Sequence, residues 1–251
     1  MHFYVTFKEF FEARTLGPED LKNFQINSQI ATKLAEMHSL PMTPEAVNTN
    51  GGPKPILWDR LLSWVELSKK CSFLDPVQRK KFNALNMSQV EKEIHALKRL
   101  LDATPSPIVF SHNDCLPGNI MLNANGRLEL IDMEYGGYNF RGFDIGNHFC
   151  EYAGFDYDKI LDMYPNKGQQ YFFFDAYLRA SGIKVIRDYQ LDSMYEEVNR
   201  YALASHLFWG LWAVVQAKHS AVDFDYLNYA QQRIGSYYMF KEKFMPTTSK
   251  L

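Results

Sequence analysis

The sequence feature that most constrains the fold is a set of polar residues around a β-hairpin signal. Asp114 is followed five residues later by Asn119, and Asp132 lies thirteen residues beyond that. Between the last two are two short apolar runs separated by Asn125-Gly126, a strong hairpin signal. Asn119 enters the first strand and Asp132 leaves the second, so both lie at the open end of the hairpin. The sequence therefore predicts that two carboxylates and a carboxamide meet there.

These residue types suit phosphoryl transfer. Mg²⁺ prefers oxygen ligands and usually takes one or two carboxylates from a protein, with phosphates and water completing its shell. We predict that Asn119 and Asp132 bind Mg²⁺ and that Asp114 accepts a proton from a substrate hydroxyl. Protein kinases use the same order: an H-x-D motif, an Asn five residues later and a metal-binding Asp beyond it. The competing explanation is an Asp-rich loop beside a structural hairpin, and the complete pattern, with His112, argues against it.

The residue identities in this region are more specific for one protein family than the spacing of the polar residues. The segments HNDCLPGN (112–119), IDMEY (131–135) and YNFRGFDIGNHFCE (138–151) resemble the choline/ethanolamine kinase family. The resemblance extends from about residue 10 to residue 238. Aminoglycoside phosphotransferases are more distant relatives, which share the H-x-D motif and the metal-binding Asp but not GFDIGNHFCE.

The resemblance implies a fold and an activity. The fold is α+β and mainly helical, the large lobe of a protein-kinase-like fold. The activity is transfer of the γ-phosphoryl group of ATP, with Mg²⁺, to the hydroxyl of choline or ethanolamine for phospholipid synthesis. It also divides the chain into a hinge remnant of a missing small lobe (1–16), the large lobe (17–244) and a flexible tail (245–251).

Roles are implied for residues beside the metal ligands. His112 belongs to the catalytic group, and we expect it to brace the loop by hydrogen bonding rather than to transfer protons. Asp144 is expected to hold the loop backbone, because buried N–H groups need acceptors. Glu134 is a candidate metal residue behind the direct ligands, provided that the strand carrying Asp132 continues that far.

An alkylammonium group needs aromatic faces for cation–π attraction and a carboxylate to balance its charge. Trp209 and Trp212 are three residues apart and share a helix face. On sequence alone such a pair is core packing, but the resemblance places it in an amine pocket. A quaternary ammonium offers no N–H group, so this aromatic set favours choline, or both amines. The residues expected in the pocket are Tyr135, Glu151, Trp209, Trp212, Phe224 and Tyr229.

Hydrophobic periodicity predicts several helices and few strands. Ser88 and Glu91 are expected to form a capping box, and Trp58 is expected to serve packing. Leu57, Leu61, Trp64, Val65 and Leu67 are expected to face the core. The predicted strands are at 108–111, 119–123 and 127–132, and 2–7 is expected to be a strand or a hinge segment. The predicted helices are at 18–38, 56–70, 77–85, 88–101, 171–180 and 189–218, with a polar connection at 154–169 and a last helix starting near Phe224 and Tyr229.

Composition narrows the function classes. A net charge of −2 provides no basic patch, so we expect no nucleic-acid partner. No apolar run reaches 18 residues, so no membrane span is expected. Three cysteines without a CxxC motif indicate reduced thiols, which favours the cytoplasm. The C-terminal Ser249-Lys250-Leu251 offers a peroxisomal address as the alternative.

Two other functions stay open. A chain without the small lobe could be a non-catalytic, regulatory partner of a full-length kinase. Pairing as a homodimer, or as a heterodimer with a full-length relative, belongs to the same set of possibilities. Phosphorylation of an aminoglycoside is the third option, but a polycationic sugar needs an acidic pocket rather than an aromatic one.

Overall fold

In the computed structural model, which describes residues 13–43, 46 and 52–245, the fold is built around one long helix, α9 (Asp188–His219). Its 32 residues span roughly 48 Å at 1.5 Å per residue. Residues 201–211 are all buried, as expected of a helix enclosed by others. The predicted helix at 189–218 is confirmed, and it forms the core of the fold.

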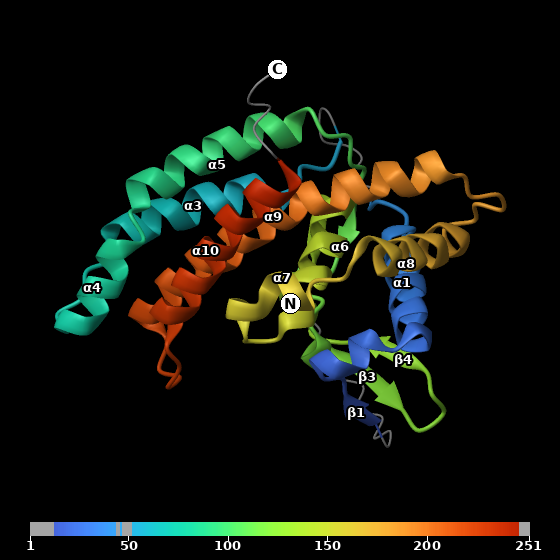
Figure 1. The fold of residues 1–251 in the computed structure, drawn as a ribbon, viewed down its shortest axis with the longest axis horizontal. Coiled ribbons are helices and arrows are strands. Elements are labelled where there is room, and N and C mark those ends of the chain that lie inside the picture. Colours follow the sequence, from blue (N-terminus) through green and yellow to red (C-terminus); the bar gives the residue numbers. More distant parts are fainter. Residues whose placement is uncertain (1–12, 44–45, 47–51, 246–251) are drawn as a thin grey trace.

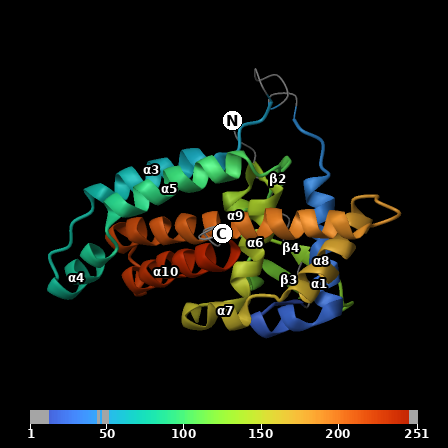
Figure 2. The ribbon, with the colours of Figure 1, turned by 45° about the horizontal axis from the view of Figure 1, so that its top comes forward.

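Five of the described helices pack against α9 (Figure 1). α3 (Ile56–Lys70) and α5 (Met87–Asp102) run side by side along it, and α10 (Tyr226–Phe244) lies against it (Figure 2). α6 (Arg141–Cys150) crosses it and carries much of the GFDIGNHFCE segment. α8 (Lys167–Ala180) is the fifth, and the remaining helices are α1 (Phe24–His38), α4 (Pro76–Ala84) and α7 (Ile160–Met163).

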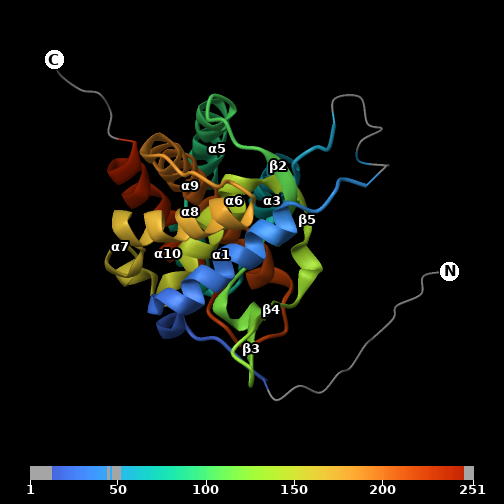
Figure 3. The same ribbon diagram turned by 90° about the vertical axis from the view of Figure 1, so that its right-hand side faces the viewer.

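Two small antiparallel sheets position the H-x-D loop (residues 112–119). β2 (Ile108–Ser111) leads into the loop and pairs with β5 (Gly137–Phe140). β3 (Ile120–Asn123) leaves the loop and lies between β1 (Ala13–Thr15) and β4 (Leu128–Leu130), in a sheet beneath α1 (Figure 3). The predicted strands at 108–111, 119–123 and 127–132 are thus confirmed within their ends, whereas β1 and β5 were not predicted.

The hairpin between β3 and β4 is confirmed, but its turn is longer than a two-residue Asn-Gly loop. Leu122 pairs with Leu128, and the N–H of Asn123 donates to the carbonyl of Arg127 at 2.9 Å. Gly126 has a φ of 74°, the left-handed conformation that closes three-residue hairpin loops. The hairpin therefore returns the chain to the H-x-D loop, as its spacing predicted.

Several helix predictions need correction. Residues 18–38 are not one helix: a 3₁₀ turn (Pro18–Lys22) ends before Asn23, whose side chain accepts the N–H of Gln25 and starts α1. The Ser88–Glu91 capping box is wrong, because Asn86, at a φ of 51°, caps α5 instead. Leu67 was expected to face the core and is 43% exposed.

The segment at 154–169 is not a polar connection. Tyr157, Ile160 and Tyr164 are buried, and the Tyr164 ring meets Phe240 of α10 with 4.7 Å between centroids. A 3₁₀ turn (Tyr157–Lys159) and α7 occupy its centre. Phe224 precedes the last helix rather than lying in it.

Some predictions fall outside what the structure describes. The predicted strand or hinge segment at 2–7 and the tripeptide 249–251 lie outside the described residues, as do most of the hinge (1–16) and tail (245–251) segments. Within residues 13–43, 46 and 52–245, no helix is both long enough and apolar enough to cross a bilayer.

The crossing of α6 over α9 depends on a glycine. A Cβ added at Gly146 would lie 2.8 Å from the carbonyl oxygen of Val198 and 2.9 Å from the amide nitrogen of Ala202. Both are backbone atoms, so Gly146→Ala must push the two helices apart. We expect a loss of about 3 kcal/mol in the free energy of unfolding, measured by urea titration.

Gly235→Ala, on α10, is the matched control. A Cβ at Gly235 meets nothing within 4 Å, so this change should stabilise the protein by about 0.5–1 kcal/mol through helix propensity. Equal stability of the two variants would contradict the close crossing.

Candidate active site

One buried carboxylate, that of Asp144, holds the backbone of the H-x-D loop, residues 112–119. Asp144 of α6 accepts the backbone N–H of His112 at 2.9 Å and of Asn113 at 2.7 Å. Its Oδ2 also lies 2.9 Å from Nε2 of His38. Burial opposes ionisation of Asp144, but the bond from His38 and the His112 amide outweigh it and hold the pKa below its ordinary value. The geometry is the one predicted for Asp144, a holder of the loop backbone.

His112 braces the hairpin against the loop. Its ring is fully buried, with Nε2 2.9 Å from the carbonyl oxygen of Ile131 and Nδ1 3.3 Å from the backbone nitrogen of Asp114. Since the Asp114 N–H must donate to Nδ1, Nε2 carries the ring proton and donates to Ile131. These are the hydrogen bonds of a residue that braces the loop, and the part of His112 in catalysis stays a prediction.

Asp114 points from the loop into a cavity, and Asn119 fixes its orientation. Nδ2 of Asn119 donates to the Asp114 carbonyl oxygen at 2.9 Å and to its Oδ2 at 3.0 Å. Among the described residues no hydrogen bond reaches Oδ1 of Asn119, which leaves that oxygen for a cation. The two residues therefore lie together, as the spacing predicted.

Asp132 begins a tight turn directly after the hairpin. It has a φ of 61° and an exposed side chain, and a 3₁₀ turn (Met133–Tyr135) follows it. The strand does not continue, so the expectation that Glu134 shares a strand face with Asp132 is wrong. Glu134 nevertheless lines the same cavity as Asp114.

The donor set fits a cation that arrives with phosphates. In the described part of the chain no group of three or more His, Cys, Asp and Glu side chains is arranged around a metal position. Mg²⁺ is ordinarily bound by one or two protein carboxylates plus substrate phosphates and water, not by an all-protein cage. An exposed Asp132 and a free Asn119 oxygen are consistent with that mode.

The cavity has a volume of about 610 Å³ and joins Asp114 to an aromatic chamber. Its described lining contains no Lys, Arg or His, so it favours a positively charged ligand. The acidic lining residues are Asp114, Glu134, Glu151 and Asp223. The aromatic ones are Tyr135, Phe155, Trp209, Trp212, Phe224, Tyr226 and Tyr229.

This surrounding makes Asp114 a weak acid. Burial raises its pKa to about 8, the charge of Glu151 adds to the shift, and the hydrogen bond from Asn119 opposes it. A bound cation favours the charged form of a nearby carboxyl. The Asp114 carboxyl therefore ionises most readily when cations occupy the site.

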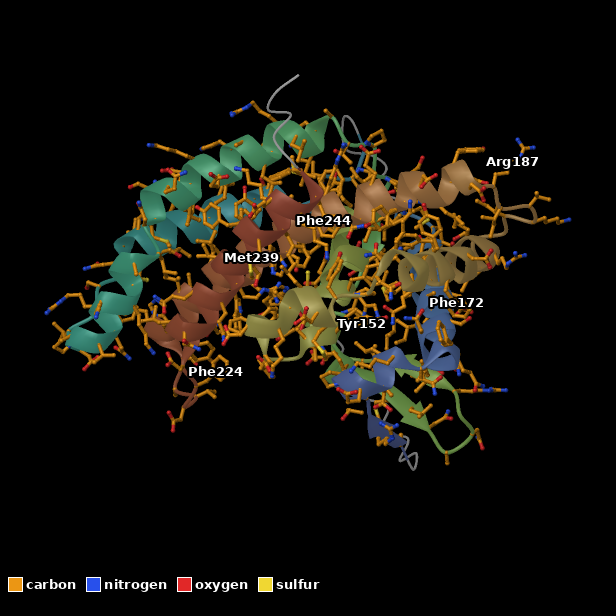
Figure 4. The ribbon with its side chains drawn as sticks, in the orientation of Figure 1. Tyr152, Phe172, Arg187, Phe224, Met239 and Phe244 are labelled. Atoms are coloured by element: carbon orange, nitrogen blue, oxygen red, sulfur yellow. The ribbon has the colours of Figure 1, made fainter. Side chains whose placement is uncertain are left out.

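The predicted amine residues meet in the aromatic chamber. The Tyr135 and Trp209 rings are 5.2 Å apart edge-to-face, and Trp209 and Trp212 are 5.4 Å apart in the same manner. Nε1 of Trp212 donates to the Tyr135 hydroxyl at 3.0 Å. Phe224 lies in the loop before α10 (Figure 4), 5.9 Å from the Tyr229 ring. These side chains and Glu151 come together at one cavity, as the resemblance implied.

The GFDIGNHFCE segment is explained by one helix face. Asp144, Asn147 and Glu151 recur at helical spacing along α6 and its end. Asn147 accepts Nε1 of Trp209 at 2.7 Å and donates to the backbone carbonyl of Asn113 at 3.3 Å. This face thereby links the aromatic chamber to the H-x-D loop.

Sequence reasoning missed several residues at this site. Phe155, Asp223 and Tyr226 line the cavity, Asn147 joins its two ends, and Arg233 pairs with Glu151. The polar spacing along α6 could have identified Asn147. Nothing in the local sequence distinguishes Arg233 from a surface arginine.

The chain resembles known proteins along most of its length. The family model described as choline/ethanolamine kinase matches residues 3–238. A probable ethanolamine kinase of Arabidopsis thaliana is 40% identical over 92% of this chain and 59% of its own. A choline/ethanolamine kinase of Homo sapiens is 37% identical over 93% of this chain and 61% of its own. The chain thus spans about three fifths of the length of these curated relatives.

The structure has the same fold as a solved relative. An ethanolamine kinase of Plasmodium vivax superposes with a TM-score of 0.84 at 28% identity, covering 96% of this chain and 68% of that one. This similarity confirms the predicted fold class, a mainly helical α+β lobe of the protein-kinase-like kind.

Proposed function

The chain belongs to the choline/ethanolamine kinase family, and we propose that it transfers the γ-phosphoryl group of ATP to the hydroxyl of choline or ethanolamine. One observation carries the proposal: a single cavity joins a positioned carboxylate, Asp114, to an acidic and aromatic chamber without basic residues among its described lining. A small amino alcohol has the matching ends, a hydroxyl and an ammonium group.

Catalysis by these residues is positioning combined with proton acceptance. Asp114 orients the substrate hydroxyl and takes its proton as the oxygen bonds to phosphorus and ADP leaves. Asn119 fixes the Asp114 carboxylate through its Nδ2. Asp132 and Oδ1 of Asn119 would hold Mg²⁺, which supplies charge neutralisation for the phosphate oxygens when bound.

The chamber recognises the ammonium end. The aromatic rings of Tyr135, Trp209 and Trp212 supply cation–π attraction, worth about 0.5–2 kcal/mol each. Glu151 supplies negative charge from the chamber wall. Rings suit a quaternary ammonium and a carboxylate suits N–H groups, so the chamber supports activity on both amines.

A steady-state assay of the chain with MgATP and either amine tests the proposal. Release of ADP that depends on choline or ethanolamine is the expected result. No turnover by a folded sample, with binding of either amine retained, would favour the non-catalytic, regulatory alternative.

Trp212→Leu tests the chamber. Loss of one aromatic face should raise KM for choline about tenfold and change kcat little, because the ring contacts the ammonium before and during the reaction. Trp58→Leu is the control, since Trp58 packs in the core away from the cavity and should leave KM unchanged while lowering stability. An unchanged KM in Trp212→Leu would remove this ring from the amine site.

The remaining roles follow from the same proposal. A choline or ethanolamine kinase supplies phosphorylated precursors for phospholipid synthesis, and we place it in the cytoplasm, with the tripeptide 249–251 as a peroxisomal alternative. Pairing with a second copy or with a longer relative stays a prediction. Sedimentation of the purified chain distinguishes these states.

A further inference from the structure

Glu151, at the wall of the aromatic chamber, is paired with a fully buried arginine. Nη1 of Arg233, on α10, lies 3.0 Å from Oε1 of Glu151, and Arg233 has no exposed surface. The hydroxyl of Tyr157 donates to the same oxygen at 3.1 Å and also contacts Nη1. Arg233 and Tyr157 thus both bind Oε1 of Glu151 from the protein interior.

The other oxygen of Glu151 is left toward the cavity. Among the described residues no hydrogen bond reaches Oε2, and this atom keeps some exposed surface. The side chain lines the cavity and is 11% exposed. Since the partners of Oε1 are themselves buried, the exposed part of the carboxylate is Oε2.

The arginine is itself fixed. Nη2 of Arg233 donates to the backbone carbonyl of Ser205 at 3.0 Å and to its Oγ at 2.8 Å. The Ser205 hydroxyl donates in turn to Oδ1 of Asn147, the residue that also holds Trp209. The guanidinium is therefore bound on both of its ends and cannot follow a ligand into the cavity.

We propose that Arg233 is a specificity-determining positioning residue, which orients Glu151 so that its free oxygen accepts the N–H groups of a primary or secondary ammonium. The proposal rests on the amino alcohol kinase activity proposed above. Aromatic faces bind an ammonium whatever its substitution, but Oε2 distinguishes amines that carry N–H from those that carry none. Burial already raises the pKa of Glu151, and Arg233 opposes that rise, so removal of Arg233 drives Glu151 toward its neutral form.

A substrate series with decreasing numbers of N–H groups tests this role. Ethanolamine, its N-methyl and N,N-dimethyl derivatives and choline carry three, two, one and no N–H groups on the ammonium. In Arg233→Met we expect kcat/KM for ethanolamine to fall by about 10- to 100-fold relative to that for choline, with intermediate losses between them. An equal loss for all four amines would overturn the proposal.

Two further variants keep the test decisive. Glu151→Gln should give the same graded loss, and the double variant should lose no more than Glu151→Gln alone, because Arg233 acts through Glu151. Additive losses would overturn the proposal.

Tyr157→Phe removes only one donor to Oε1. It should lower kcat/KM for ethanolamine relative to that for choline by a smaller factor than Arg233→Met does. If Arg233→Met does not fold, an unchanged ratio of the two kcat/KM values in Tyr157→Phe overturns the proposal.

Failure of the proposed activity is recognised separately. Quenching of Trp209 and Trp212 fluorescence by the four amines reports binding without turnover. If the unmodified chain turns over none of them, the proposed function fails. The amine series still tests Arg233 through the graded binding constants, and a binding loss equal for all four amines overturns its role.

Discussion

Asp114→Asn is expected to abolish turnover and at the same time to stabilise the protein. The amide cannot accept the hydroxyl proton, so kcat should fall at least about 100-fold. Stability should rise because the buried Asp114 carboxylate is disfavoured by burial and by the charges of Glu151, Asp132 and Glu134. The amide retains an oxygen for Nδ2 of Asn119, so the loop geometry is preserved.

The gain in stability should depend on pH with a defined sign. The pKa of Asp114 is raised to about 8 in the folded chain, so below pH 4 the carboxyl is protonated in both the folded and unfolded states. As the pH rises to 8, only the unfolded chain ionises, and the folded state loses relative stability. The advantage of Asp114→Asn therefore grows from near zero at pH 4 to several kcal/mol above pH 8, with an upper limit of roughly 6 kcal/mol.

Urea unfolding at pH 5 and pH 8.5, in the presence of EDTA, measures this effect. Asp102→Asn on the exposed face of α5 is the control and should change stability by less than about 0.5 kcal/mol at both values. An active Asp114→Asn variant would remove Asp114 from the role of base. If Asp114→Asn were less stable than the parent at pH 8.5, the Asp114 carboxylate of the parent would not be destabilising.

The same chemical change at Asp144 should have the opposite effect. Asp144→Asn places an NH₂ group where the carboxylate accepts the N–H groups of His112 and Asn113. Loss of a buried, paired charge typically costs about 3–5 kcal/mol, and we expect a decrease of that size in the free energy of unfolding. Because the H-x-D loop loses its support, kcat should also fall at least about 100-fold.

The pH dependence again gives a sign. The pKa of Asp144 is below its ordinary value, so its contribution to stability is complete at pH 7 and is lost only as the pH falls into the acid range. Calorimetric unfolding at pH 7 measures the free energy of unfolding of Asp144→Asn and of Asp114→Asn, each against the parent chain. A stable and active Asp144→Asn chain would contradict the support role. His38→Gln, which removes one partner of Asp144, should produce a milder loss in the same direction.

The site could be predicted from the sequence where its parts are close along the chain. Asp114, Asn119 and Asp132 flank one hairpin, so their spacing alone predicts that they lie near one another; Asn119 bonds to Asp114, and the charge of Asp132 acts on the Asp114 carboxyl. Both ends of α3 were predicted to the residue, because the apolar pattern of the sequence begins and ends where the helix does. The break at Asn23 was missed because its cap competes with a helical pattern that continues across it.

The missed features depend on contacts between distant segments. β5 contains Gly137 and Asn139, which have weak strand propensity, and its pairing with β2 stabilises it. Arg233 is 82 residues from Glu151, and a fully buried arginine is rare enough that exposure is the default expectation. Leu67 was misplaced because its helix has more apolar residues than its buried face can hold.

The crossing of α6 over α9 has a consequence for how the proposed activity can evolve. One rigid face of α6 supports the H-x-D loop through Asp144, binds Trp209 through Asn147 and ends at Glu151. A substitution that reshapes the aromatic chamber by shifting this helix also displaces the loop that carries Asp114. Changes in substrate preference that preserve turnover should therefore accumulate on the side of the chamber formed by α10 and the loop before it, leaving the sequence of α6 largely fixed.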